Sequence, residues 1–379
     1  MWRVEILKKL LLVANVSKEH IRKFYIPFIA LLKENGWQVD VACRMDVPVP
    51  ECDTAYDLPC DRNPFQGGIY RSVNILKQIL QQNNYDLLVC STVVGSIVAR
   101  LAASFFRKIG LKVIYMCHGL HFFPGASVSR WVMGYPTEKL LASKTDVIII
   151  TNDTDLDTAK KHLNIPIVEK SHSMGVNLPR FREAALSESE RINHRKMLGI
   201  APKDYVLIYV AEIIANKNQT MLLEAFETVQ KAVPNAKLML VGPEHDDGAL
   251  RKLTESKGLK NDVLFLGWRS DVPILLHLAD VYVASSKSEG LGLNLIEAMA
   301  CGLPVIATKN RGHAETVLHG RTGFLVDVND SDDMAAHVLQ LHDSEELRMS
   351  ITAQAQQEIE KYGTEAAIKE LVEMVVRHA

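Results

Sequence analysis

The 379-residue sequence lacks several features that would place it in other protein classes. Its six cysteines show no Cys-x-x-Cys spacing, which argues against a structural zinc site. No apolar run approaches the roughly 20 residues that a membrane-spanning helix needs. The apolar run Leu10–Ala14 is too short for the core of a signal peptide. We therefore expect free thiols in a reducing compartment and a cytoplasmic protein.

An excess of charge of one sign is also missing, since 43 Lys and Arg residues face 45 Asp and Glu residues. This balance argues against broad nucleic-acid binding, which usually needs a basic domain. The charge is nevertheless uneven, because residues 1–178 are net positive and the remainder is net negative. A basic face on the first half alone is therefore possible.

The length predicts two domains rather than one. Short apolar runs alternate with amphipathic segments through the first half, and the same rhythm restarts at Tyr205–Val210. This alternation predicts an α/β fold with two doubly wound parallel sheets. We predict domains at 1–178 and 179–355, a polar linker at 179–195, and a C-terminal helix over 356–379 that packs back on the first domain.

The first strand is not followed by the glycine-rich turn of a dinucleotide-binding fold. That position reads Ala14-Asn-Val-Ser-Lys-Glu-His20, without a glycine. A dehydrogenase is therefore disfavoured.

The segment Ser285–Pro304 carries the strongest chemical signal. A strand is expected to end near Ser285, a loop with two glycines follows, and a helix is expected to open near Asn294. Such a helix start offers unpaired N–H groups to a diphosphate or a sugar hydroxyl. A second interpretation stays open, in which Asn294 and Glu297 form only a capping box.

The spacing Glu289-Gly-Leu-Gly-Leu-x-x-x-Glu297-Ala-Met-Ala-Cys-Gly-x-Pro304 resembles the Glu-x7-Glu signature of the family-4 retaining glycosyltransferases. The resemblance runs from about Lys9 to Leu371 and implies the GT-B fold, two Rossmann-like domains that face a cleft. Within that family the chain is similar to enzymes of capsule and exopolysaccharide assembly. The narrower likeness rests on Arg62-Asn-Pro64, His118-Gly-Leu-His-Phe-Phe-Pro-Gly125, Tyr135-Pro-x-Glu138, Asn216-Lys-Asn218 and Arg311-Gly-His313.

The resemblance implies a donor site in the second domain. Glu289 would contact the donor sugar, and Glu297 would bind the ribose hydroxyls of the nucleotide. The loop amides of Gly290, Leu291, Gly292 and Leu293 would face the sugar and the diphosphate.

The phosphate side departs from the family pattern. Lys217 keeps the family lysine that holds the leaving diphosphate, whereas Glu212 stands where the family has arginine. Arg311 is a candidate for a second cation. We expect Lys217 to be the main phosphate partner, and a solvated loop lysine is the alternative interpretation. The base is expected against Gly242, Trp268 and Arg269, with uracil the usual base in this group.

In the first domain, His118 matches the family histidine that approaches the transferring sugar. We assign His20, Arg62, Arg71 and His121 to the acceptor side. A buried structural histidine remains an alternative for His118, as does an exposed loop residue for His20.

The implied reaction retains the anomeric configuration, and the leaving diphosphate itself takes the acceptor's proton. The protein then supplies positioning and electrostatic stabilisation. A covalent intermediate on Glu289 is the rival mechanism. The acidic run Asp153-Thr-Asp155-Leu-Asp157 resembles a metal motif, but we interpret it as a helix start. No cofactor and no essential metal are expected.

Residues 100–144 combine basic and aromatic side chains with a single acid, Glu138. Such a face suits an anionic membrane surface and a lipid-diphosphate acceptor, although burial of most of these side chains in a core is equally open. The basic residues are Arg100, Arg107, Lys108, Lys112, Arg130, Lys139 and Lys144, and the aromatic ones are Phe105, Phe106, Tyr115, Phe122, Phe123, Trp131 and Tyr135.

The family resemblance implies a transferase that moves a hexose or N-acetylhexosamine from a UDP-sugar to a lipid-linked glycan in bacterial surface polysaccharide assembly. It would be peripheral at the inner face of the cell membrane and would bind no nucleic acid. The alternatives are a nucleotide-sugar epimerase and a non-catalytic UDP-sugar-binding protein on the same fold.

Overall fold

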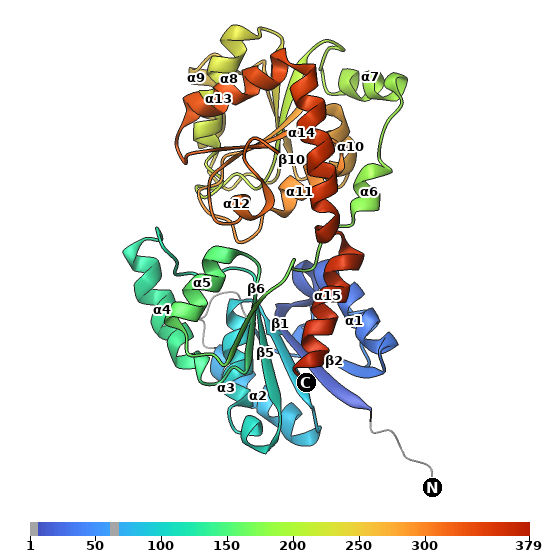
Figure 1. The fold of residues 1–379 in the computed structure, drawn as a ribbon, viewed down its shortest axis with the longest axis vertical. Helices are drawn as coiled ribbons and strands as arrows, with labels where there is room; N and C mark the ends of the chain where they lie inside the picture. Colours follow the sequence, from blue (N-terminus) through green and yellow to red (C-terminus); the bar gives the residue numbers. More distant parts are fainter. Residues whose placement is uncertain (1–6, 61–67) are drawn as a thin grey trace. The chain divides into compact units, whose positions relative to one another are not determined.

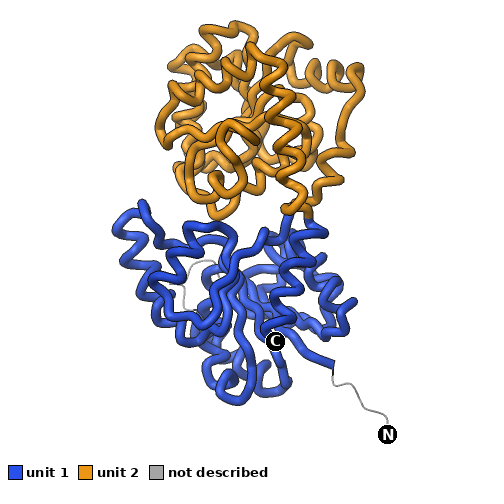
Figure 2. Tube along the Cα trace, in the orientation of Figure 1, with its two compact units in different colours: residues 1–175, 364–379 blue, residues 176–363 orange. Residues whose placement is uncertain are grey.

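The computed structural model describes residues 7–60 and 68–379. Arg62, an acceptor-side candidate, and the Asn63-Pro64 pair beside it lie outside the described residues. The chain divides into two compact units (Figure 2). Unit 1 comprises Met1–Gly175 and Thr364–Ala379, and unit 2 comprises Val176–Gly363. Within the described ranges, no helix is both long and apolar enough to cross a membrane.

Unit 1 is built on a seven-stranded sheet in the order β3-β2-β1-β4-β5-β6-β7, with every neighbouring pair parallel. The strands are β1 (Lys8–Val16), β2 (Trp37–Arg44), β3 (Ala55–Asp57), β4 (Leu87–Ser91), β5 (Lys112–Cys117), β6 (Val147–Ile150) and β7 (Ile167–Lys170). The helices are η1 (Ser17–Tyr25), α1 (Ile26–Glu34), α2 (Gly68–Gln82), α3 (Val93–Ala103), η2 (Phe106–Ile109), α4 (Val128–Ala142), α5 (Asp153–His162) and α15 (Thr364–Arg377).

The central strand β1 is buried on both faces, as expected for a parallel sheet covered by helices. Its side chains alternate, because successive residues of a strand point to opposite faces. Leu11 and Val13 join the core under α2 and α3, whereas Leu10 and Leu12 join the core under α1 and α15. Helices α1 and α15 pack side by side, so the C-terminal helix belongs to unit 1 (Figure 1).

Unit 2 contains a six-stranded sheet in the order β10-β9-β8-β11-β12-β13, also parallel throughout. The strands are β8 (Tyr205–Val210), β9 (Ala236–Val241), β10 (Val263–Gly267), β11 (Val281–Ala284), β12 (Val305–Thr308) and β13 (Phe324–Val326). The helices are α6 (Leu178–Arg182), α7 (Glu188–Met197), α8 (Gln219–Ala232), α9 (Ala249–Ser256), α10 (Val272–Leu278), α11 (Leu293–Ala300), α12 (His313–Thr316), α13 (Ser331–Asp343), α14 (Glu345–Glu358) and η3 (Ile359–Tyr362).

The predicted α/β architecture of two Rossmann-like parallel-sheet domains is confirmed. The linker predicted at 179–195 is wrong, because α6 and α7 occupy most of it. Asn177 caps α6 with Pro179 in its first turn, and Ser187 and Glu190 form a capping box at the start of α7. In each sheet the strand order reverses beside the first strand, and ligands of such folds bind at the carboxyl ends there.

Candidate active site

The loop that follows β11 connects two buried serines to the start of α11. Ser285 and Ser286 are buried, and Glu289 and Glu297 are each partly buried. Helix α11 begins at Leu293 with Gly292 as its N-cap, and no side chain caps it. The capping-box interpretation is therefore wrong: Asn294 lies inside the helix and its amide donates to the Val210 carbonyl at 3.4 Å. A helix start suits an anionic ligand in general, although here the Leu293 and Leu295 N–H groups already donate to the Leu291 and Gly292 carbonyls.

Lys217 and Glu289 form the central contact of this site. The Lys217 Nζ lies 2.6 Å from Glu289 Oε1, and the two side chains are 21% and 18% exposed. Lys217 follows β8 and Glu289 follows β11, and these strands are neighbours in the sheet. The contact shows that Lys217 is not a solvated loop lysine.

Hydrogen bonds to backbone carbonyls hold the two loops of this ion pair together. The Asn216 carbonyl accepts from Lys287 N at 2.8 Å, and the Asn216 amide donates to the Ser288 carbonyl at 2.9 Å. The Ser285 hydroxyl donates to the Lys217 carbonyl at 2.8 Å. Glu289 is therefore held in place by its backbone as well as by its charge.

The segment after β12 supports the other side of the Glu289 loop. Asn310 donates to the Ser286 carbonyl at 2.9 Å, and Arg311 Nε donates to the Glu289 carbonyl at 3.2 Å. A Cβ on Gly312 would lie 2.8 Å from the Glu289 backbone, so this position has no room for a side chain. Arg311 thus lies at the predicted donor site, where it contacts the backbone of Glu289.

His313 follows in the same segment and is buried. Its Nδ1 lies 2.8 Å from the Thr308 carbonyl, to which an Nδ1–H can donate. Burial lowers the pKa of His313 to about 4, so the ring is neutral near pH 7.

The predicted base site lies where β8, β9 and β10 end. Gly242 N donates to the Gly267 carbonyl at 2.8 Å, and a Cβ on Gly242 would lie only 2.1 Å from the Ala211 carbonyl oxygen. Trp268 is 74% exposed, and Arg269 pairs with Asp271 at 2.5 Å. The structure thus leaves the Trp268 indole accessible to a ligand.

Glu212, which departs from the family pattern, has an exposed side chain. Its carbonyl accepts from Gln219 Nε2 at 2.9 Å, which fixes the backbone at the turn into α8.

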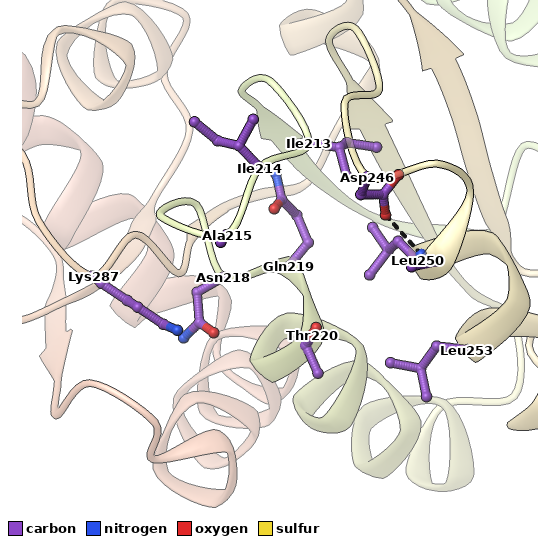
Figure 3. A pocket seen from close by; sticks show the side chains of 11 residues that line it. Ile213, Ile214, Ala215, Asn218, Gln219, Thr220, Asp246, Leu250, Leu253 and Lys287 are labelled. Carbon is purple, nitrogen blue, oxygen red and sulfur yellow. Dashed lines mark hydrogen bonds between the residues drawn. The ribbon is translucent and has the colours of Figure 1, made fainter.

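A pocket of about 350 Å³ lies beside the loop that carries Lys217 (Figure 3). In Figure 3 the side chains of Asn218 and Lys287 point toward one another at one end, and Asp246 accepts from Leu250 N at 2.7 Å at the other. The lining residues include none of the predicted donor-site residues. They are Ile213, Ile214, Ala215, Asn218, Gln219, Thr220, Asp246, Ala249, Leu250, Leu253 and Lys287.

In unit 1, His20 and His118 come together at the carboxyl ends of β1 and β5. Their ring centroids are 5.7 Å apart, and Ser91 Oγ lies between them, 2.9 Å from His20 Nε2 and 3.0 Å from His118 Nε2. Tyr25 Oη lies 3.1 Å from His118 Nε2. Ser91 and Tyr25 were missed by the sequence analysis, because they adjoin the histidines only in the folded sheet.

Both histidines are neutral near pH 7. Burial, followed by repulsion from His118, lowers the pKa of His20 to about 3. Burial lowers the pKa of His118 to about 4. His20 is therefore a partly buried member of this polar cluster and not an exposed loop residue.

The remaining acceptor-side candidates lie on the surface of unit 1. Arg71 is exposed on α2, and His121 is exposed in the segment after β5. The structure does not place either one in the histidine cluster.

Much of the predicted basic and aromatic face is structural. Arg100 is fully buried and holds Glu138 with two hydrogen bonds of 2.7 and 3.1 Å, and its guanidinium stacks over Tyr115 at 4.2 Å. Arg107 pairs with Asp146, and Phe122 is buried. Arg100 can be buried because its guanidinium and the Glu138 carboxylate satisfy each other in bidentate geometry. Arg130 and Lys139 stay exposed on α4.

The acidic run after β6 begins a helix, as predicted. Helix α5 starts at Asp153, and Asn152 caps it by accepting from Asp155 N at 2.8 Å. The Asp155 carboxylate accepts from Leu120 N and from the Asn152 amide, each at 3.0 Å. Through these two hydrogen bonds, the Asp155 carboxylate ties the start of α5 to the segment after β5. That no metal is needed stays a prediction.

Two family comparisons and several relatives agree with this architecture. Residues 190–358 match the family "Glycosyl transferases group 1", and residues 9–152 match "Glycosyl transferase 4-like". The "Putative glycosyltransferase EpsD" of Bacillus subtilis (strain 168) is 36% identical over 97% of this chain and 96% of its own length. An Escherichia coli protein named "UDP-Gal:alpha-D-GlcNAc-diphosphoundecaprenol alpha-1,3-galactosyltransferase" is 25% identical over 89% of this chain and 87% of its own length.

Solved structures show the same fold. The Anabaena protein Alr3699/HepE in complex with UDP matches with a TM-score of 0.78 at 21% identity, covering 98% of this chain and 100% of that one. WaaG, a glycosyltransferase involved in lipopolysaccharide biosynthesis, matches with a TM-score of 0.74 at 16% identity over 97% and 99% of the two chains. The solved structures thus define the GT-B fold of this chain, and its relatives make it a glycosyltransferase. The chain belongs to the group 1, glycosyltransferase 4-like family.

Proposed function

We propose that this chain transfers a hexose or N-acetylhexosamine from a UDP-sugar to a lipid-linked glycan, with retention of the anomeric configuration, in bacterial surface polysaccharide assembly. The observation that carries the proposal is the Lys217–Glu289 ion pair beside the start of α11. The pair supports the proposal because it joins an ammonium, which suits a diphosphate, to a carboxylate, which suits sugar hydroxyls. A carboxylate accepts hydrogen bonds from hydroxyls, and an ammonium binds phosphate oxygens.

The donor would be bound by unit 2. The N–H groups at the start of α11 and Lys217 would hold the diphosphate, with Arg311 as a second cation. Glu297 on α11 would accept from the ribose hydroxyls. The base would lie against Gly242, Trp268 and Arg269, where the exposed indole supports this role. UDP in the Anabaena structure supports uracil as the base.

The reaction would proceed without a covalent intermediate. Lys217 stabilises charge on the leaving diphosphate, which takes the proton of the attacking hydroxyl on the same face. Glu289 is held by Lys217 and by Arg311 through its backbone, which suits a residue that positions the sugar. A trapped glycosyl adduct on Glu289 would favour the rival covalent mechanism. No metal takes part in these steps.

The acceptor would be bound by unit 1 through His20, Arg62, Arg71 and His121, and His118 would act beside the transferring sugar. The name of the Escherichia coli relative describes an acceptor linked to a diphosphate-carrying lipid, which supports a lipid-linked acceptor here. The likeness to EpsD supports a place in exopolysaccharide synthesis.

Helix α4 would provide peripheral contact with the inner face of the cell membrane. Its exposed side chains include four large apolar residues accompanied by Arg130 and Lys139. An apolar surface with cations beside it suits the boundary of an anionic bilayer. The four apolar residues are Val128, Val132, Met133 and Leu140.

Vesicle flotation tests this contact. Wild-type protein should float with phosphatidylglycerol-containing vesicles, and Met133→Asp should reduce the floating fraction several-fold. Met349→Asp is a matched control, because Met349 on α14 is also 67% exposed. Equal flotation of Met133→Asp and the wild type would contradict a role for α4.

The reaction is tested with a panel of UDP-sugars, each with and without lipid-linked glycan. Transfer predicts UDP release that depends on the acceptor. Interconversion of UDP-sugars without acceptor would instead identify an epimerase. Tight UDP binding without turnover would identify a non-catalytic binder. Glu212 is the reason to test this alternative, because it stands where the family pattern has an arginine.

A further inference from the structure

Three strands of unit 1 bring four polar side chains together at their carboxyl ends. His20 and Tyr25 lie on η1 directly after β1, Ser91 ends β4, and His118 follows β5. Strands β1 and β4 are neighbours at the point where the strand order reverses. Side chains at that point face the usual ligand position of a doubly wound sheet. The region is therefore a place where an ordered polar network affects a ligand directly.

The Ser91 hydroxyl has only one hydrogen but two imidazole neighbours. Its Oγ lies 2.9 Å from His20 Nε2 and 3.0 Å from His118 Nε2. If both rings are neutral, Ser91 donates to one Nε2 and accepts from the other, which must then carry a hydrogen. Ser91 also contacts the Tyr25 hydroxyl. If Ser91 directs its hydrogen to a ring and not to Tyr25, the two histidines are in opposite tautomers.

Tyr25 decides which ring carries hydrogen on Nε2. The Tyr25 hydroxyl can donate to Met116 Sδ at 3.6 Å, and its oxygen lies 3.1 Å from His118 Nε2. An unprotonated Nε2 has one lone pair and would be poorly suited to accept from both Ser91 and Tyr25. An N–H of His118, in contrast, can be shared between the two oxygens. This arrangement gives every one of these polar groups a partner.

The backbone beside Ser91 supports a functional constraint on its position. Thr92 has φ 64° and ψ 158°, a region that is normally restricted to glycine and costs about 1–3 kcal/mol. Asn15 holds this turn, because its Oδ1 accepts from Thr92 Oγ1 and from Gly95 N, each at 2.6 Å. A Cβ on Gly95 would lie 2.9 Å from the Ala14 backbone, so β1 and the start of α3 are in tight contact. The strained turn fixes the fully buried Ser91 between the two rings.

We propose that Ser91 is a positioning residue that ties His20 to His118 in opposite neutral tautomers, with hydrogen on His118 Nε2 and on His20 Nδ1. His118 Nδ1 then carries a lone pair. Within the described part of the chain, that nitrogen has no hydrogen-bond partner. It can accept a hydrogen bond from a hydroxyl group but cannot donate one.

This assignment deepens the proposed function and rests on it for its chemical meaning. A glycosyl acceptor presents a hydroxyl whose oxygen must attack the sugar. A ring nitrogen that accepts from that hydroxyl directs an oxygen lone pair elsewhere and orients the nucleophile. Tyr25 and Ser91 prevent the His118 ring from turning into the donating form.

Nitrogen NMR of the full chain labelled with ¹⁵N-histidine tests the tautomers at neutral pH. The chain has 13 histidines, so His20→Gln and His118→Gln assign the two rings. We expect His118 to be protonated on Nε2 and His20 on Nδ1. Two rings in the same tautomer, or a charged ring, would overturn the proposal without the need for any Ser91 variant.

Ser91→Ala and Tyr25→Phe test the cause of the tautomers. Ser91→Ala should change the His20 ring signals, and Tyr25→Phe should change those of His118 while His20 stays as it is. The control is Ser143→Ala, an exposed serine of unit 1 whose hydroxyl donates to the Leu140 carbonyl. An unchanged His20 signal in folded Ser91→Ala would show that Ser91 does not set its tautomer.

Transfer assays distinguish a failure of the tautomer assignment from a failure of the proposed function. Ser91→Ala should lower kcat by about tenfold to a hundredfold, the range seen when a partner of a functional histidine is lost. KM for the UDP-sugar should change less than twofold or so, because the donor is proposed to bind unit 2. If wild-type protein shows no transfer but the rings have the expected tautomers, the proposed function fails and the tautomer assignment stands.

Discussion

Lys217 Nζ lies 2.6 Å from Glu289 Oε1, so the two side chains form an ion pair. The predicted ligand of Lys217 is the diphosphate, whereas that of Glu289 is the donor sugar. The pair joins the loops after β8 and β11 at the start of α11. A diphosphate that binds Lys217 would have to share this cation with the carboxylate. In the proposed donor site, the contact would therefore couple the group that binds phosphate to the group that binds the sugar.

Glu289→Gln should separate these two sides. Loss of the carboxylate charge frees Lys217, so the affinity for UDP should rise by about tenfold, which corresponds to about 1.4 kcal/mol. Sugar transfer should fall by at least about a hundredfold, since the sugar contact is lost. Calorimetric titration with UDP and an assay of UDP release measure the two effects.

Lys217→Met should have the reverse effect on the nucleotide and weaken UDP binding by about tenfold or more. Lys287→Met is the matched control, because Lys287 is an exposed lysine two residues before Glu289 and should leave UDP affinity within about twofold. Weaker UDP binding by Glu289→Gln, or equal effects of the two lysine variants, would contradict the assigned roles.

Gly312→Ala should displace Glu289. The added Cβ would lie 2.8 Å from the Glu289 backbone, and that contact can be relieved only by moving one of the two loops. We expect transfer to fall by about tenfold or more while the protein stays folded. Gly320→Ala is the control: its φ of +73° makes it mildly strained, but nothing lies within 4 Å of its Cβ. Similar activity losses in both variants would point to a general effect on unit 2.

Stability should fall as the pH drops below about 6.5. The His118 and His313 rings are neutral in the fold because burial lowers the pKa of each to about 4, whereas an unfolded histidine takes up a proton near pH 6.5. The stabilisation is present above pH 6.5 and is lost as the pH falls toward 4. Between pH 7.5 and 5, each ring should contribute about 2 kcal/mol to this loss.

Urea denaturation at a series of pH values measures this dependence. His118→Gln should reduce the slope in unit 1, and His313→Gln should reduce it in unit 2. A free energy of unfolding that is constant from pH 7.5 to 5 would show that the rings are not buried as neutral groups.

Arg100→Met should destabilise unit 1 by about 3–5 kcal/mol, because it leaves the Glu138 carboxylate buried without its cation. Arg44→Met removes a solvent-exposed pair with Asp46 and should cost less than about 1 kcal/mol. Urea denaturation followed by circular dichroism compares them. Equal costs would mean that Arg100 contributes only a surface charge.

The fold was largely predictable because buried parallel strands appear as short apolar runs, as β1 and β11 do. Helix α4 was not predicted, since Gly134 and Pro136 lie inside it and both are helix breakers. Tertiary contacts hold it instead, above all the ion pair of Glu138 with Arg100. Helix α7 was predictable in principle from its Ser187 and Glu190 capping box.

The donor-site residues could be proposed from the sequence because Glu289 and Glu297 occur in one local motif. Ser91 and Tyr25 occur in no such motif. Ser91 is 27 residues and Tyr25 is 93 residues from His118 in the sequence. The pairing of β4 with β1 and β5 brings all three side chains together. Contacts of this kind depend on strand order, which a local pattern does not encode.

The most direct test of the central claim is a transfer reaction with purified protein, a UDP-sugar and a lipid-diphosphate-linked glycan, followed by mass spectrometry and NMR of the product. We expect the acceptor to gain one hexose or N-acetylhexosamine, with one UDP released per transfer and the donor's anomeric configuration retained in the new bond. An unchanged acceptor mass with every UDP-sugar, or an inverted anomeric centre, would contradict the proposed function.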